Sequence, residues 1–225
     1  MVIYANSDSY GVLSTTGIRY PEVVGQLLDM PVNNQGQSGS CNRRILRTST
    51  RDLLQLDNVY LAVICLAPLT RGEWWNPRKV PTNNDGHFES FQISNLDLKH
   101  SPCADYANHW YRLYNDEAEE TNLFSELILF TGWLKSRGVK YLIFSGNNAT
   151  IKKIDPEDVF LRDFYHTLKD DPGVLDLYDF SFTKFCLSKG HRPFDYDSYG
   201  EYGHHGETAH RDFARYLLEE YERRY

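Results

Sequence analysis

The chain has 225 residues, of which 41% are hydrophobic and 14% aromatic, and its formal net charge is −7. A chain of this length and composition buries a sizeable core, which excludes a disordered protein and fits a single domain. The acidic balance lacks the basic footprint of non-specific nucleic-acid binding, so no nucleic-acid partner is favoured.

The cysteines and the first residues bear on location. The four cysteines are widely spaced and form no CxxC pair, which favours a reducing compartment over a secreted disulfide framework. The chain opens on the apolar residues 2–5 without a basic region before them, and it contains no run of 18 apolar residues. We therefore expect a cytoplasmic protein with no membrane partner.

Short apolar runs alternate with longer amphipathic ones along the chain. In chain order they predict strand 2–5, helix 20–29, strand 31–33, helix 42–55, strand 58–66, helix 117–137, strand 139–144, helix 157–169, strand 174–180 and helix 206–224. This alternation predicts an α/β protein: a flavodoxin-like three-layer α/β/α sandwich with a central, mostly parallel five-stranded sheet, in one domain spanning residues 1–225.

Residues 67–116 interrupt the alternation. They carry Pro, Asn, Gly and aromatic residues with little periodicity. A structureless segment of this length is unusual inside a compact domain, and such segments are often functional. It is either a lid over a site or an oligomer contact, and the second alternative allows a homo-oligomer.

Polar residues follow the predicted strands where ligands bind in such sheets, beyond the carboxyl ends. Ser7 follows the first strand, the Gly-rich stretch 34–40 follows the second, and the sequence Glu201-Tyr202-Gly203-His204 precedes the last helix. A hydroxyl, a Gly-rich turn and an acid–histidine pair at one edge are what acyl-transfer chemistry requires.

Three of these stretches resemble the SGNH (GDSL-type) hydrolase superfamily. ANSDSYG resembles the first block, GDSxTxG, with Ser7 on the nucleophile. NQGQSGS is similar to the second block, in which an Asn is followed five positions later by the oxyanion-hole glycine, here Gly39. EYGHHGETAHRDFARYL resembles the fifth block, DxxHPN, which places His204 on the catalytic base and Glu201 on the usual Asp.

The resemblance implies a Ser-His-acid triad acting on a small-molecule or glycan ester. His204 would take the proton of Ser7, Glu201 would orient the imidazole, and the backbone N–H groups of Ser7 and Gly39 would receive the oxyanion. SCNRRI, and Arg and Glu at positions 71 and 73, also resemble phage-encoded members. This implies a virus-encoded accessory enzyme in the host cytoplasm.

The third block of the superfamily is not matched. Its Gly-x-Asn should fall near residues 65–69, where the sequence reads CLAPL without an Asn. One expected oxyanion donor is therefore missing, and losing one such donor typically costs about 10²–10³ in rate. Thr70, Arg71 and Asn147 are the residues that could replace it.

Several site assignments have alternatives. Ser9 is the rival nucleophile, because Ser7-Asp8-Ser9 also aligns on a GDS-like triplet, and His205 is the weaker base candidate. Asp195 and Asp197 lie close upstream of Glu201 and offer another carboxylate. A zinc site at the C-terminal histidines would need a second ligand cluster, which is absent, so we expect no metal and no other cofactor.

Arginines 43, 44, 47 and 51 fall on one predicted helix. They either form a solvated face or capture an anionic substrate, and Arg44 and Arg71 are the candidate substrate-binding residues. Two alternatives to an esterase remain: a catalytically degenerate SGNH-fold binding or structural module of a phage, and an acyl transferase to a sugar or nucleotide.

Overall fold

A computed structural model of the chain describes residues 1–12, 17–77, 85–92, 104–147, 161–194 and 204–225. In these residues the central sheet has the strand order β2-β1-β3-β6, and each neighbouring pair is parallel. The strands are β1 (Val2–Asn6), β2 (Val32–Asn34), β3 (Val59–Leu66) and β6 (Tyr141–Ser145). Residues 61–66 of β3 are all buried, as expected for a strand covered on both faces.

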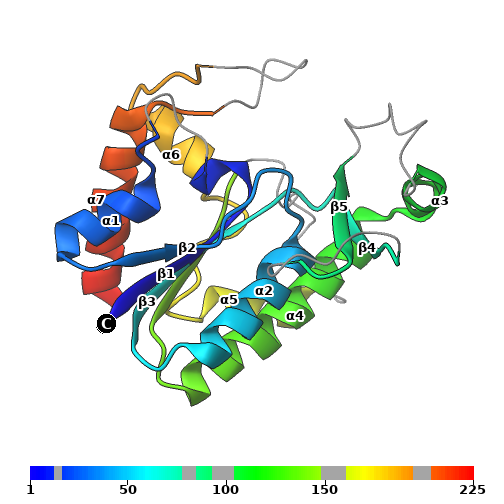
Figure 1. Ribbon diagram of the computed structural model, residues 1–225, viewed down its shortest axis with the longest axis horizontal. Coiled ribbons are helices and arrows are strands. Elements are labelled where there is room, and N and C mark those ends of the chain that lie inside the picture. Colours follow the sequence, from blue (N-terminus) through cyan, green and yellow to red (C-terminus); the bar gives the residue numbers. More distant parts are fainter. Residues whose placement is uncertain (13–16, 78–84, 93–103, 148–160, 195–203) are drawn as a thin grey trace.

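Helices cover both faces of this sheet (Figure 1). One face, here called the α1/α7 face, carries α1 (Tyr20–Leu28), α6 (Phe182–Ser188) and α7 (Glu207–Arg224). The other, the α2/α4 face, carries α2 (Asn42–Gln55), α4 (Asp116–Ser136) and α5 (Arg162–Lys169). The predicted three-layer α/β/α architecture with a parallel sheet is confirmed.

The helix predictions agree with the structure within a few residues. Helices α1, α2, α4 and α7 match the predicted ranges 20–29, 42–55, 117–137 and 206–224. The first residues of the predicted helix 157–169 lie outside the described part of the chain, and α5 begins at Arg162.

The predicted fifth strand, residues 174–180, is wrong as a continuous strand. Val174 and Ser181 each form a single parallel bridge with β6, opposite Ile143 and Ser145. Between them the Asp176 carboxylate accepts the backbone N–H groups of residues 178 and 179, so the chain turns there. Ser181 then caps α6, which the sequence patterns did not indicate.

The insertion at 67–116 has its own secondary structure. Strands β4 (Arg71–Trp75) and β5 (Phe88–Gln92) form an antiparallel hairpin, and α3 (Ala104–Leu113) follows. A small core joins them, made by Phe91 and Ala107 with Trp74, Trp110 and Tyr111 packed against it. These aromatic residues recur too irregularly along the chain to show a period, because a hairpin and a helix share one core.

The described cysteines behave as plain core residues. Cys41, Cys65 and Cys186 are free and buried, and burial raises the pKa of all three thiols. Cys103 lies outside the described residues. Among the described helices, none combines the length and the apolar character that crossing a membrane requires.

Candidate active site

The end of β1 directs the side chains of Asn6 and Ser7 to opposite faces of the sheet. Ile3 and Ala5 pack in the core of the α1/α7 face, whereas Tyr4 packs in that of the α2/α4 face. Because side chains alternate along a strand, Ser7 follows Ala5 toward α1 and Asn6 follows Tyr4 toward α2. The hydrogen bonds of Asn6 confirm this, since its amide reaches residues of α2.

Asn6 ties β1 to α2. Its Nδ2 donates to the carbonyl of Ile45 at 3.1 Å, to Thr48 Oγ1 at 2.8 Å and to Ser49 Oγ at 3.0 Å, and its Oδ1 accepts the backbone N–H of Ser7 at 2.9 Å. An Asp would lack the amide donor. The sequence motif alone did not single out this residue as a site support.

Ser7 lies in a space that only glycines leave open. Its side chain is buried, and Oγ donates to the carbonyl of Asp8 at 3.0 Å. A Cβ atom at Gly11 would stand 2.1 Å from Ser7 Oγ and 3.1 Å from the Tyr20 hydroxyl, and one at Gly36 would stand 2.5 Å from Ser7 Oγ. Two glycines from different segments therefore converge on the candidate nucleophile.

The second motif is hydrogen-bonded beside the first. The N–H of Gln35 donates to the carbonyl of Ala5 at 2.8 Å, and that of Gln37 to the carbonyl of Ser7 at 3.0 Å. Gly39 then turns the chain with φ of +79°, a conformation that favours glycine, before Ser40 donates back to Gln37. The structure thus brings the residue 34–40 turn next to Ser7.

His204 lies against Tyr10 of the short helix η1 (Ser9–Gly11). Its half-buried ring has its centroid 5.7 Å from that of Tyr10 and 6.1 Å from that of Phe194. Burial raises the pKa of Asp8, and the nearby Arg71 and, to a smaller extent, His204 oppose the rise. His205 is instead fully buried against Phe182.

Of the other triad candidates, the structure describes Ser9 but not the three carboxylates. Glu201, Asp195 and Asp197 lie outside the described residues. Ser9 is buried and its carbonyl accepts the N–H of Val12, at the start of η1. In the described residues, no group of three or more His, Cys, Asp and Glu side chains could hold a metal ion.

The end of β3 is fixed by a side chain rather than by a Gly-x-Asn. Asn42 donates to the carbonyl of Ala67 at 2.9 Å and accepts the N–H of the same residue at 2.8 Å. Of the three replacement candidates, Thr70 accepts the Tyr111 hydroxyl on its carbonyl, and Asn147 donates to the Tyr10 hydroxyl at 3.1 Å.

The third replacement candidate, Arg71, pairs with a carboxylate next to the candidate nucleophile. Its Nη1 lies 2.8 Å from Asp8 Oδ2 and 3.3 Å from the carbonyl of Ser40. Asp8 is fully buried. Burial raises the pKa of this carboxyl, and the Arg71 guanidinium opposes the rise.

Each arginine of α2 has a carboxylate partner. Arg43 reaches Glu119 and Glu126, Arg47 pairs with Glu73, and Arg51 with Asp52, while Arg44 is 2% exposed and lies 2.6 Å from Asp85. Arg44 and Arg71, the candidate substrate-binding residues, therefore both contact carboxylates of the chain itself.

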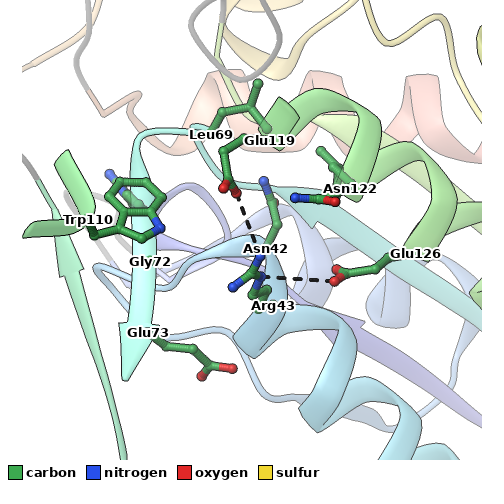
Figure 2. A pocket seen from close by; sticks show the side chains of 11 residues that line it. Asn42, Arg43, Leu69, Gly72, Glu73, Trp110, Glu119, Asn122 and Glu126 are labelled. Carbon is green, nitrogen blue, oxygen red and sulfur yellow. Dashed lines mark ion pairs between the residues drawn. The ribbon is translucent and has the colours of Figure 1, made fainter. Parts of the chain in front are cut away.

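A cavity between β4, α2 and α4 lies beside Arg71. Its volume of about 20 Å³ is room for about one water molecule, so it is too small for a substrate. Figure 2 shows Arg43 pointing toward Glu119 and Glu126 of α4, at 3.8 and 4.0 Å, with Glu73 and Trp110 on the hairpin side. The cavity is thus part of the contact between the hairpin and the helices.

The solved structures with a similar fold decide how this architecture is classified. The chain aligns over its whole length with the whole of TesA, with 13% identity and a TM-score of 0.53. It also aligns over 97% of its length with 98% of a G-D-S-L family protein from Desulfitobacterium hafniense DCB-2, with 12% identity and a TM-score of 0.52. The alignment with the acetyl xylan esterase AlAXEase likewise covers 97% of this chain and 98% of that chain, with 12% identity and a TM-score of 0.50.

The chain has the SGNH hydrolase fold. No protein-family model matches its sequence, and no curated protein does. The likeness therefore concerns the fold, at a sequence divergence that agrees with the altered motif blocks.

In the SGNH fold of this chain, the first two sequence motifs meet at the end of β1 through backbone hydrogen bonds. Sequence reasoning missed Asn6, Asp8 and Asp85 as supports of this region. Asp8 follows the candidate nucleophile directly and could have been noticed as a charged residue after an apolar strand. Asp85 carried no such local signal, because its partner Arg44 lies 41 residues away.

Proposed function

We propose that this protein is a serine esterase or acyl hydrolase that uses Ser7 as nucleophile and His204 as general base. Glu201 is the proposed orienting acid, with Asp195 and Asp197 as the alternative carboxylates. The backbone N–H groups of Ser7 and Gly39 are the proposed oxyanion donors. The proposal treats residues 1–225 as one catalytic domain.

One observation carries the proposal. Ser7 lies at the carboxyl end of β1, where a Cβ atom at either Gly11 or Gly36 would clash with its hydroxyl. At the same place, the backbone N–H groups of residues 35 and 37 donate to the carbonyls of residues 5 and 7. Ligands of open α/β sheets bind at this edge. A serine that only capped a helix would not require glycines from two separate segments around it.

The proposed reaction is hydrolysis of an ester by way of an acyl-enzyme. His204 accepts the Ser7 proton while Oγ attacks the carbonyl carbon, and the imidazolium then gives the proton to the leaving alcohol. A water molecule, deprotonated by His204, attacks the acyl-enzyme, which releases the acid and restores Ser7. The Ser7 N–H, which donates to Asn6 Oδ1 in the resting structure, turns its bond toward the oxyanion.

The substrate class is a small or carbohydrate-linked ester. Acetyl xylan esterases are among the proteins that share this fold, which supports an acylated glycan as the first class to try. The resemblance to phage-encoded members supports an accessory enzyme that acts in the host cytoplasm. No cofactor enters the proposed chemistry.

A second function is favoured by the burial of Ser7. Its side chain is 1% exposed and its hydroxyl is engaged by the Asp8 carbonyl, while the third-block Asn is missing. These features would suit a binding or structural module of a phage in which the SGNH fold has lost its activity.

A fluorophosphonate probe separates the two functions, because it labels an activated serine without any knowledge of the substrate. We expect the native protein to be labelled, Ser7→Ala to lose the label and Ser9→Ala, the matched control, to keep most of it. Labelling that follows Ser9 would move the nucleophile. An unlabelled native protein under varied pH would favour the binding module.

A further inference from the structure

Two ion pairs connect the β4–β5 hairpin to the candidate site, and the hairpin supplies the arginine in one pair and the aspartate in the other. Arg71 of the hairpin lies 2.8 Å from Asp8 of the Ser7 loop, and Asp85 of the hairpin lies 2.6 Å from Arg44 of α2. All four side chains are nearly buried, with exposed fractions of 14%, 0%, 10% and 2%. Removing one partner of such a pair would leave a charge buried without compensation.

Both guanidinium groups also hold the turn that carries Gly39. Arg71 Nη1 donates to the carbonyl of Ser40 at 3.3 Å, and Arg44 Nη1 donates to Ser40 Oγ at 3.1 Å. Arg44 Nη2 donates to Gln37 Oε1 at 2.8 Å. Ser40 is the neighbour of Gly39, so the two arginines bind the turn from the hairpin side and from the helix side.

Asp8 transmits these contacts to the residue before it. One carboxylate oxygen binds Arg71, the other accepts the N–H of Tyr10 at 3.1 Å, and the Asp8 carbonyl accepts Ser7 Oγ. A shift of Asp8 would therefore move the hydroxyl of Ser7 and the Tyr10 ring that faces His204.

These contacts leave little of Arg44 for a substrate. Every nitrogen of the Arg44 guanidinium donates within the protein: Nε to Asp85, Nη1 to Ser40 and Nη2 to Gln37. A planar guanidinium can hold several acceptors at fixed angles, which suits it to keeping two loops in register.

We propose that the β4–β5 hairpin holds the turn of residues 34–40 in place beside Ser7, a role that we call the brace. Arg71 and Asp8 are the positioning residues that keep Ser7 in register with Gly39. The Arg44–Asp85 ion pair is the second attachment of the hairpin. The brace rests on the proposed esterase function. It gives part of the 67–116 insertion a role that is neither a lid nor an oligomer contact.

The test compares Arg71→Met, Arg71→Lys and Asp8→Asn with Glu73→Gln in the full chain. Glu73 lies on the same strand as Arg71 and pairs with Arg47 at 2.8 Å, so its variant disturbs the hairpin without touching the Asp8–Arg71 pair. With the neutral ester p-nitrophenyl acetate, Arg71→Met and Asp8→Asn should lower kcat by about 10–100-fold with little change in KM, because misplacement by about 1 Å has this cost.

Arg71→Lys should restore part of kcat, since an ammonium keeps the charge beside Asp8 but cannot hold Ser40 in the same geometry. Glu73→Gln should keep kcat within about threefold. A rise in KM for an anionic ester alone, such as the p-nitrophenyl monoester of succinate, with native kcat on p-nitrophenyl acetate, would make Arg71 a substrate ligand and overturn the brace.

Amide hydrogen exchange of residues 35–41 tests the brace independently of activity. We expect exchange at least tenfold faster in Arg71→Met than in the native protein, at unchanged rates in β3, and native rates in Glu73→Gln. Unchanged exchange in Arg71→Met would contradict the brace. A native protein that shows the expected exchange but neither hydrolysis nor probe labelling would contradict only the proposed function.

Discussion

The two faces of the sheet support the end of β1 in different ways. On the α1/α7 face, aromatic rings surround it: Tyr20 stacks on His210, and Phe182 contacts Tyr20, His210 and Phe213 with centroids 4.8 to 5.7 Å apart. On the α2/α4 face, hydrogen bonds and ion pairs do this work, through Asn6, Asp8 and their partners.

The end of β1 is thus positioned by two different kinds of contact. Apolar and aromatic contacts are weakly directional, so the α1/α7 face determines which volume Ser7 occupies. Hydrogen bonds to amides and guanidinium groups are directional, so the contacts on the α2/α4 face determine the orientation of the backbone at the end of β1. Changes of volume should therefore damage one face, and changes of polarity or charge the other.

We expect Gly11→Ala, which adds volume beside Ser7, to reduce activity more than any other substitution considered below. An added Cβ would stand 2.1 Å from Ser7 Oγ and 2.8 Å from Ser7 Cβ, so Gly11→Ala must displace the serine. We expect labelling by the fluorophosphonate probe and ester hydrolysis to fall by at least about 100-fold.

Gly132→Ala is the matched control for Gly11, because a Cβ at this exposed position of α4 meets nothing within 4 Å. It should leave activity native and raise the free energy of unfolding by about 0.5–1 kcal/mol, since alanine favours the helix. Native activity in Gly11→Ala would mean that the space around Ser7 does not set its position.

On the polar side, Asn6→Ala should mainly cost stability. The substitution leaves the Ile45 carbonyl and two hydroxyls of α2 without their amide donor, and the Ser7 N–H without its acceptor. We expect the free energy of unfolding in urea to fall by about 2–4 kcal/mol. Asn33→Ala, which removes one partly buried bond to Gln35, should cost less than about 1 kcal/mol. Equal losses would refute the special role of Asn6.

The smallest expected effect concerns Glu120, a fully buried carboxyl of the α2/α4 face. Burial raises its pKa from 4.5 to about 7, and the Tyr178 hydroxyl offsets part of the rise. The protonated form is therefore favoured by folding, so its contribution to stability is full below pH 4.5 and is lost as the pH rises through about 7.

In the native protein, Glu120 should lower the free energy of unfolding by about 1–2 kcal/mol between pH 5 and pH 8. Glu120→Gln should remove this loss. Urea unfolding at the two pH values measures it. Glu117→Gln, on the exposed side of the same helix, keeps the Glu120 carboxyl and should keep most of the native pH dependence, because the Glu117 charge is a lesser cause of the raised Glu120 pKa. The same pH dependence in Glu120→Gln and in the native protein would assign it to other groups.

The α/β fold follows from the sequence because its signals are local. The continuous apolar run of β3 requires two covered faces, and the periodic face of α7 requires a core beneath it. The motifs around Ser7 and Gly39 were also visible, because each is a short turn directly after a strand. Their meeting followed from one rule of parallel sheets, that strand ends share an edge.

The tertiary structure alone decided the rest, because those contacts join residues that no local pattern relates. The Asp176 carboxylate turned the predicted fifth strand into two bridges, although the apolar pattern continued through it. Arg44 and Arg71, the candidate substrate ligands, pair with Asp85 and Asp8, which lie 41 and 63 residues away along the chain. An arginine has the same side chain whether it faces solvent, substrate or a buried acid, and only packing selects its partner.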